Sequence, residues 1–287
     1  MAPRARRPRP DGARRFVPAA RRGEIAELAE AVADEHCPAV PVDPEAVAAA
    51  KGITVSFGRY GEAFDGMLEQ KGGRFHVYCN VERVGERGAP RARFTLAHEV
   101  GHYYLDEHRN ALLDGRAAAH GSRCDHESPL LAEQEADHFA ANLLMPAGRF
   151  APSAKAATPG LEGVLKLAGA FGTSLTSVAV RYAACDPLPC AAIKWGWSGA
   201  AWKVLSSGAF QMRFGRSIER PGELAPGSPT ARALAREVPP ECGFFQAGTL
   251  AAAWFRRIRP GDDRDAILIE QAIPLGRHGV LTVLHVP

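Results

Sequence analysis

The sequence has no apolar run long enough to cross a membrane. A transmembrane helix needs about 18 or more consecutive apolar residues, and no stretch of the 287 residues approaches that length. The basic N-terminal segment is not followed by the apolar core that a secretory signal peptide carries. We therefore expect a cytoplasmic protein that neither spans a membrane nor has a membrane partner.

Cysteines are also few and irregularly spaced. The six cysteines form no CxxC pair and no regular framework: Cys37, Cys79, Cys124, Cys185, Cys190 and Cys242. Reduced thiols are the expected state in a cytosolic protein. Cys185 and Cys190 could form a redox or metal pair, but a single C-x4-C without partner residues is weak support for one.

Acidic residues are almost absent from the first 22 residues. This segment has eight arginines and one aspartate, a charge of +7, whereas the rest of the chain carries −4. Because it is rich in Arg and Pro and nearly free of apolar residues, we predict a disordered basic arm at residues 1–21. The arm could contact nucleic acid or an acidic partner, but a purely solubilising segment is the simpler interpretation.

The most informative motif that is present is HEVGH at residues 98–102. Residues four apart lie about 400° apart around an α-helix, so His98 and His102 share one face and can bind one metal ion. Glu99 lies beside that face and can act on a water at the metal. This HExxH pattern is typical of zinc hydrolases. Ordinary core histidines are the alternative, which is disfavoured because ionisable groups in apolar surroundings are costly unless paired or bound to a metal.

A catalytic zinc site needs a third protein ligand, and the helical pattern over residues 130–146 offers two acids. Glu133 lies on the apolar stripe, three residues before Ala136, whereas Glu135 is rotated about 200° from Glu133. We therefore predict Glu133 as the third ligand and keep Glu135 as the alternative. Asp137, one turn later, is placed either to accept the free ring N–H of a ligating histidine or on solvated helix surface.

Two sequence blocks carry a family resemblance. The first is RARFTLAHEVGHYYL at residues 91–105, and the second is EQEADHFAANLLMP at residues 133–146. They are similar to the Arg-x-x-Phe-Thr-x-Ala-His-Glu helix of the ImmA/IrrE metallopeptidase family and to its later Glu-x-x-Ala-Asn/Asp-x-Phe-Ala helix, which ends in Leu-Met-Pro. The resemblance covers roughly residues 22–184. It implies that the metal ligands are His98, His102 and Glu133 and that Glu99 is the catalytic acid/base.

The resemblance also implies a function. Members of this family make limited, regulatory cuts in a specific protein, typically a helix-turn-helix repressor, in a stress response or in the control of mobile elements. Two other classes remain open. One is a zincin-like regulator that binds a ligand, DNA or a transcription factor without cutting it, and the other is a toxin–antitoxin component. No residue is predicted to stabilise the oxyanion, because helix rotation directs neither Tyr103 nor Tyr104 at the metal.

The rest of the pattern predicts an α+β protein with a small zincin-like domain at residues 22–185. Two helices and three short strands precede the motif helices: residues 23–36, 42–52, 53–58, 66–70 and 74–80. In this layout the sheet packs on the metal-binding helix, and an extended substrate pairs with a sheet edge. The polar insert at residues 106–130 carries no prediction of shape, but it contains a weak candidate for a second metal site, formed by His120, Cys124 and His126.

Residues 161–184 resemble a helix-turn-helix, with two short helical patterns around Gly172 and Ser174 as a cap. A helix that reads DNA presents several polar side chains to the bases, whereas the second helix here offers chiefly Arg181. We therefore expect a helical pair packed under the zincin core rather than a DNA-binding motif.

The pattern of residues 186–287 predicts a smaller, sheet-rich α+β domain after a Pro-containing linker. One helix at residues 228–237 interrupts seven short strand patterns: AAIKWGW, AAWKVLS, FQMRFG, GFFQAG, AAAWFRR, AILIEQAIP and GVLTVLHVP. Some members of the family carry a GAF-like sensory module here, so a sensory role is one interpretation. Four tryptophans could line a ligand groove, although aromatic residues at strand spacing more often form a core: Trp195, Trp197, Trp202 and Trp254.

Removal of residues 1–20 is expected to leave the rate of peptide cleavage unchanged, because no predicted site residue lies in the arm. Comparison of the cleavage rates of the full chain and the truncated chain tests this, and a large loss on truncation contradicts it.

Overall fold

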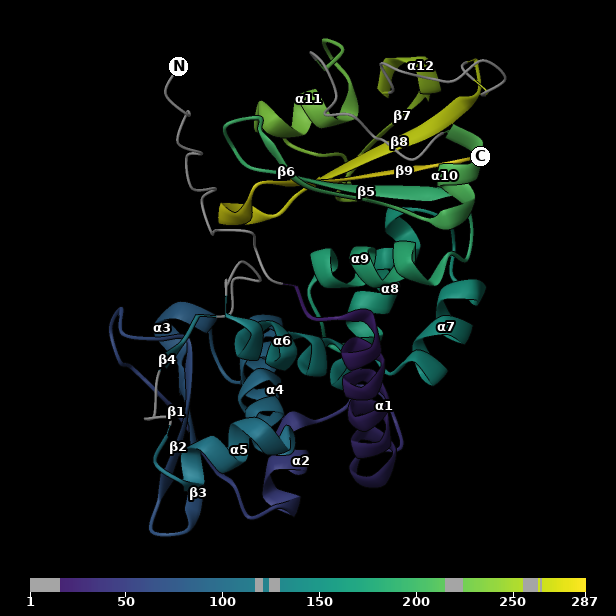
Figure 1. Cartoon of the computed structure of the whole chain (residues 1–287). Coiled ribbons are helices and arrows are strands. Elements are labelled where there is room, and N and C mark those ends of the chain that lie inside the picture. Colours follow the sequence, from purple (N-terminus) through teal and green to yellow (C-terminus); the bar gives the residue numbers. More distant parts are fainter. Residues whose placement is uncertain (1–15, 117–120, 124–129, 215–223, 255–262, 264) are drawn as a thin grey trace, which may run out of the picture. The chain divides into compact units, whose positions relative to one another are not determined.

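The computed structural model describes residues 16–116, 121–123, 130–214, 224–254, 263 and 265–287 (Figure 1). Its contacts divide the chain into two units, Met1–Pro146 and Ala147–Pro287. Most of the basic arm lies outside the described residues, as do His120, Cys124 and His126. Among the described residues, no single helix is both long and apolar enough to cross a bilayer, and one helical pair passes that test only across a bend of 111°.

The first unit contains every helix and strand that the sequence predicts for it, within a few residues. Asp43 caps the second helix by accepting the N–H of Glu45 at 3.0 Å, and Gly72 and Gly73 have φ angles of 57° and 76° in the hairpin turn. The elements are α1 Ala19–His36, α2 Pro44–Ala50, β1 Thr54–Gly58, β2 Gly66–Lys71, β3 Arg74–Asn80, α3 Val81–Val84, α4 Pro90–Tyr104, α5 Asp106–Leu113, β4 Gly121–Ser122 and α6 Leu131–Leu144.

The first helix begins inside the segment predicted as the arm. The sequence places the arm at residues 1–21, but α1 begins at Ala19. Val17, just before it, is 6% exposed and belongs to the core of the unit. The sequence analysis assigned Val17 to the arm because its neighbours are rich in Arg, but its side chain is part of the core. A truncation that tests the arm alone must therefore end at residue 15.

A small sheet and a layer of helices enclose the core of the first unit. The strand order is β1-β3-β2-β4, with β1 parallel to β3 and the other neighbours antiparallel. Helix α6 packs against both α1 and α4, and α4 also packs against β2 and β3 (Figure 1). The buried residues between them are apolar from every element, for example Ile25, Val77, Leu96, Phe139 and Leu143.

Gly101 lets α4 and α6 approach each other closely. A Cβ at this position would lie 3.0 Å from Cδ1 of Phe139 and 3.3 Å from the backbone oxygen of Ala136, both on α6. A larger side chain would have to push the two helices apart, because protein interiors are closely packed. The short distance between the HExxH helix and the glutamate helix therefore depends on glycine at position 101, which has no side chain.

The second unit is built around a five-stranded antiparallel sheet of order β6-β5-β9-β8-β7. Helix α9 packs on β5 and β6, and α11 packs on β7, β8 and β9, so helices cover both faces of the sheet (Figure 1). The elements are α7 Ala147–Ala156, α8 Leu161–Phe171, α9 Leu175–Cys185, β5 Cys190–Trp195, β6 Ala201–Ser206, α10 Gly208–Phe214, α11 Pro229–Leu234, β7 Phe245–Leu250, α12 Ala251–Trp254, β8 Ile267–Pro274, η1 Gly276–His278 and β9 Val280–His285.

The predicted helical pair is present as α8 and α9, but its neighbours differ from the prediction. Gly172 ends α8 in the left-handed conformation, and the Ser174 hydroxyl accepts the N–H of Ser177 at 3.2 Å at the start of α9. The contacts of α9 with β5 and β6 place the pair in the second unit, whereas we expected it under the zincin core at residues 22–185. An apolar helix face predicts burial but does not say which neighbour covers it.

The mixture of helices and two small sheets confirms the α+β class, but two predicted strands are wrong. The described residues of FQMRFG, 210–214, lie in α10, and AAAW lies in α12. Phe210 and Phe214 are buried while Met212 between them is 83% exposed, which is the four-residue period of a helix rather than the two-residue period of a strand. Trp195 and Trp254 belong to the core, whereas Trp197 lines a surface pocket and the side chain of Trp202 lies outside the described residues.

Gly101→Val is expected to lower the free energy of unfolding by about 1–3 kcal/mol, because overpacking at a close helix contact forces the backbone to shift. Gly23→Val is the matched control, since a Cβ on Gly23 in α1 meets nothing within 4 Å. Thermal unfolding of both variants measures the difference, and equal stability of the two would show that the close approach is unimportant.

Candidate metal centre

The HExxH residues lie on the buried part of α4. Pro90 occupies the first turn of this helix, where the missing N–H costs no hydrogen bond, and the helix runs unbroken through the motif. His98 and Glu99 are each 1% exposed and His102 is 5% exposed. Burial of three ionisable side chains in one helical turn is costly unless they bind one another or an ion.

Glu133, from the first turn of α6, completes a cluster with the two histidines. The Nε2 atoms of His98 and His102 are 3.1 Å apart. The carboxylate of Glu133 lies 3.3 Å from each of them, through Oε2 to His98 and through Oε1 to His102. In four-coordinate zinc, with bonds of about 2.0–2.1 Å, neighbouring ligand atoms are separated by about 3.3 Å. The three side chains are therefore spaced to hold one metal ion, and they are buried.

Glu135 lies elsewhere. Its Oε1 accepts a hydrogen bond from Nε of Arg21 at 3.2 Å, and its Oε2 accepts one from Nη2 of the same arginine at 3.3 Å. The helix rotation that favoured Glu133 over Glu135 is thus seen in the geometry, and the ligand role of Glu133 stays a prediction.

Asp137 lies beside the first histidine. Its Oδ1 is 2.8 Å from Nδ1 of His98, the ring nitrogen that does not face Glu133. A carboxylate in this position accepts the N–H of the ring and leaves Nε2 free of hydrogen, as metal binding requires. The geometry matches the first of the two alternatives for Asp137 and not the solvated surface.

Gly66, the first residue of β2, makes room for Glu99. A Cβ on Gly66 would lie 2.7 Å from Oε1 of Glu99 and 2.5 Å from Cγ2 of Thr95, so any larger residue would displace the glutamate. The preceding Asp65 is fully buried and binds Arg91 at 2.7 Å and also Arg83. Although burial alone would raise the pKa of Asp65, the two guanidinium groups hold it below its usual value. This ion-pair cluster anchors the start of β2 beside Glu99.

Tyr103 and Tyr104 are committed to packing. The ring of Tyr103 lies 5.0 Å from that of Phe75, and the ring of Tyr104 lies 5.6 Å from that of Phe139. Burial raises the pKa of Tyr104 above its ordinary value. Neither tyrosine is assigned to the oxyanion, as expected from the sequence.

The structure adds His108, which the sequence analysis missed. Its Nδ1 lies 3.1 Å from Nδ1 of His102, and its Nε2 lies 3.1 Å from Oε2 of Glu135. Burial, together with the neighbouring His102, lowers the pKa of His108 to about 4. Helical spacing gave no signal for this residue, because Leu105 is extended and separates α4 from α5.

Comparison with known proteins identifies the segment that carries this site. Residues 85–182 match the family model described as the IrrE N-terminal-like domain of the M78 peptidases. The chain contains an IrrE N-terminal-like domain. The ImmA/IrrE resemblance drawn from the two helices is thereby confirmed, and the matched region runs from the turn before α4 into α9. No curated protein matches the sequence.

Among solved structures, the fold is similar to that of a Mycobacterium tuberculosis transcriptional regulator. The TM-score is 0.55 at 14% sequence identity, and the match covers 91% of this chain and 74% of the other. At this identity the likeness concerns the fold. It extends through both units.

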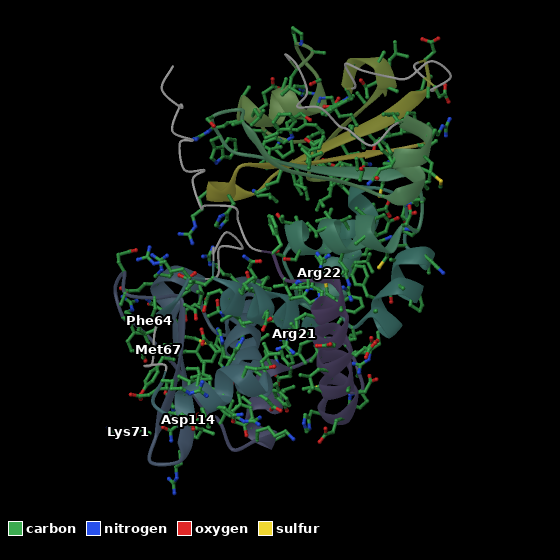
Figure 2. All side chains as sticks on the ribbon, viewed as in Figure 1. Arg21, Arg22, Phe64, Met67, Lys71 and Asp114 are labelled. Carbon is green, nitrogen blue, oxygen red and sulfur yellow. The ribbon has the colours of Figure 1, made fainter. Side chains whose placement is uncertain are left out.

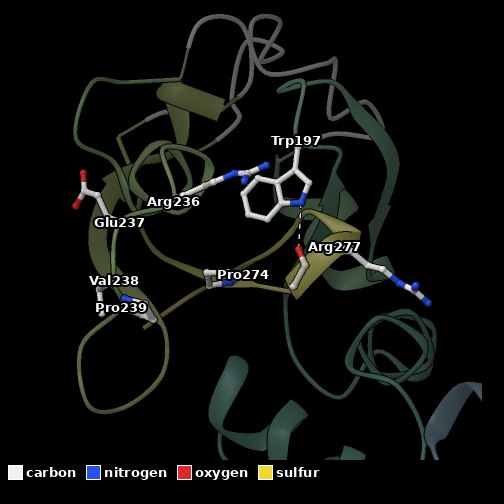
Figure 3. A pocket seen from close by; sticks show the side chains of 8 residues that line it. Trp197, Arg236, Glu237, Val238, Pro239, Pro274 and Arg277 are labelled. Carbon is white, nitrogen blue, oxygen red and sulfur yellow. Dashed lines mark hydrogen bonds between the residues drawn. The ribbon is translucent and has the colours of Figure 1, made fainter. Parts of the chain in front are cut away.

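The second unit has a separate open pocket of about 610 Å³ beside Trp197 (Figure 3). The indole Nε1 of Trp197 donates to the backbone oxygen of Gly276 at 3.0 Å. The guanidinium group of Arg236 lies 4.5 Å from the centroid of the Trp197 ring, so the face of the indole is already covered. Cys185 and Cys190 are free thiols, and burial raises the pKa of Cys190 to about 12. The possible redox pair therefore lacks a reactive thiolate at Cys190.

Glu133→Gln is expected to reduce the zinc content of the dialysed protein much more than Glu135→Gln, because only the first change removes a carboxylate from the cluster. Metal analysis after dialysis against metal-free buffer measures both variants. The reverse order would assign the third ligand to Glu135.

Proposed function

We propose that this chain is a zinc-dependent metallopeptidase that makes limited, regulatory cuts in a specific protein. The observation that carries the proposal is the buried cluster of His98, His102 and Glu133, whose ligand atoms lie within 4.8 Å of one another, with Glu99 on the same helix turn. The IrrE N-terminal-like domain supports it. So does the packing of a small sheet against the HExxH helix, which is the arrangement expected of a zincin-like domain.

Each residue of the cluster has a role in this proposal. His98, His102 and Glu133 would hold the ion through Nε2, Nε2 and the carboxylate. Zinc, when bound, supplies a Lewis acid that polarises a carbonyl and makes water a nucleophile near neutral pH. The carboxylate of Glu99 accepts the proton of the attacking water and then passes it to the departing amine. Asp137 keeps the proton of His98 on Nδ1.

The sheet edge at β2 supports an extended peptide as the substrate. The strand starts beside Glu99 at Gly66. Among the described residues, β4 pairs with β2 at Gly66 and Met67 alone. An extended chain can add to such an edge by main-chain hydrogen bonds. Figure 2 marks Met67 and Lys71 along this strand.

The particular substrate is proposed from the family resemblance alone. A helix-turn-helix repressor is the class that the resemblance suggests, and the cytoplasm remains the predicted location. The residues of β2 after Met67 are Leu68, Glu69, Gln70 and Lys71, a mixture that selects no substrate sequence by charge.

A zincin-like regulator that does not cleave is the second candidate, and the structural likeness to a transcriptional regulator favours it. Such a protein would act on DNA or a transcription factor, or respond to a ligand. A DNA-reading role for α9 is disfavoured, because Val178, Ala179 and Tyr182 bury one face of this helix and it packs on β5 and β6. Arg181 is the one basic side chain that α9 contributes.

Glu99→Gln is expected to lower the cleavage rate by orders of magnitude while zinc binding is kept, because the change removes the base and none of the three ligands. Glu82→Gln is the matched control, since the carboxylate of Glu82 caps a loop by accepting the N–H of Gly61 at 2.7 Å. The assay follows cleavage of a repressor encoded beside the gene, together with zinc content.

The same variant separates the two candidates in cells. If a strain that produces Glu99→Gln shows the defect of a deletion strain, cleavage is the function. Full rescue of the deletion by Glu99→Gln would instead establish the non-cleaving regulator.

A further inference from the structure

The two histidines of the cluster are held by different kinds of partner. Nδ1 of His98 meets a carboxylate directly, at 2.8 Å from Asp137. Nδ1 of His102 instead meets another imidazole, at 3.1 Å from Nδ1 of His108. The side chain of His108 is 11% exposed, so this second ring is largely removed from water.

A metal ion at Nε2 of His102 would determine where the protons of both rings lie. A neutral imidazole has one N–H and one acceptor nitrogen. If Nε2 of His102 faces a metal ion, its proton is on Nδ1, and Nδ1 of His108 must accept it. The proton of His108 is then on Nε2, from which it donates to Oε2 of Glu135 at 3.1 Å. Both rings are neutral in this arrangement, and both hydrogen bonds run in the same direction.

Glu135 is held in turn by the first helix of the unit. Both carboxylate oxygens accept from Arg21, at 3.2 and 3.3 Å, and Nη2 of Arg21 also binds Glu107 of α5 at 2.8 Å. Arg21 belongs to α1, where Figure 2 marks it. Arg21 of α1, His108 of α5 and Glu135 of α6 therefore form one hydrogen-bonded group that contacts His102 through His108.

We propose that His108, oriented by Glu135 and Arg21, is a positioning residue that fixes the tautomer and ring orientation of His102 for metal binding. The inference rests on the proposed function, because it presumes a metal ion at Nε2 of His102. It gives Glu135 a role other than that of a ligand, and it connects the N-terminal helix to the metal centre. Outer partners of ligating histidines typically contribute about 10–100-fold to metal affinity.

The test measures zinc affinity of the full chain by competition with a chromophoric chelator. His108→Leu is expected to bind zinc about 10–100-fold more weakly than the unmodified chain. His108→Gln should recover most of that loss, because its amide oxygen can accept from His102 while its amide N–H donates to Glu135. His76→Leu is the control, since the ring of His76 contacts Thr54 and Tyr78 rather than a cluster residue.

Two further readouts distinguish positioning from general destabilisation. The Co²⁺ absorption spectrum should change in His108→Leu and Glu135→Gln and remain unchanged in His76→Leu. The unfolding midpoint of the metal-free protein should fall no more in His108→Gln than in His76→Leu. If His108→Leu does not fold, Glu135→Gln and His108→Gln carry the test.

The failure of this inference can be told from that of the proposed function. An unmodified chain that binds no zinc refutes the proposed function and the inference with it. A chain that binds zinc with the same affinity and the same Co²⁺ spectrum after His108→Leu, or after Glu135→Gln if the leucine variant does not fold, overturns the inference alone.

Discussion

The close packing of α4 against α6 is the constraint on which the site depends. The two helices belong to distant parts of the sequence, and the cluster exists only where one brings two imidazoles and the other a carboxylate to the same point. Gly101 permits the approach because it presents no side chain to Phe139. The apolar residues around this contact contribute stability through burial, and the ionisable residues need each other, or a metal ion, because they are buried with them.

The surroundings of the cluster are arranged to keep its ligands in one state. Asp137 binds one ring nitrogen of His98, while His108 and Glu135 form a longer connection to His102. On the side of Glu99, the buried Asp65 and its two arginines hold the start of β2 in place. Rigid ligands lose little conformational entropy when an ion binds, so this network favours a preformed site.

The sequence predicted the parts of the site that depend on local periodicity. The four-residue spacing of His98 and His102 and the position of Glu133 on an apolar stripe follow from helical geometry, and the structure brings these residues together. His108 and Gly66 could not be predicted, because their roles depend on how α5 and β2 return to α4. The strand predicted from FQMRFG was wrong, because over so short a run the apolar residues fit the period of a strand as well as that of a helix. The helical pair at α8 and α9 was predicted correctly, but its packing partner was not.

The central claim is that His98, His102 and Glu133 bind one zinc ion. Zinc K-edge X-ray absorption, combined with metal analysis of protein purified without chelators, tests it most directly. We predict one equivalent of zinc per chain, with two imidazole nitrogens and carboxylate oxygen at about 2.0–2.2 Å. A chain that contains no zinc and takes up none on titration, or zinc coordinated by sulfur, would contradict the account.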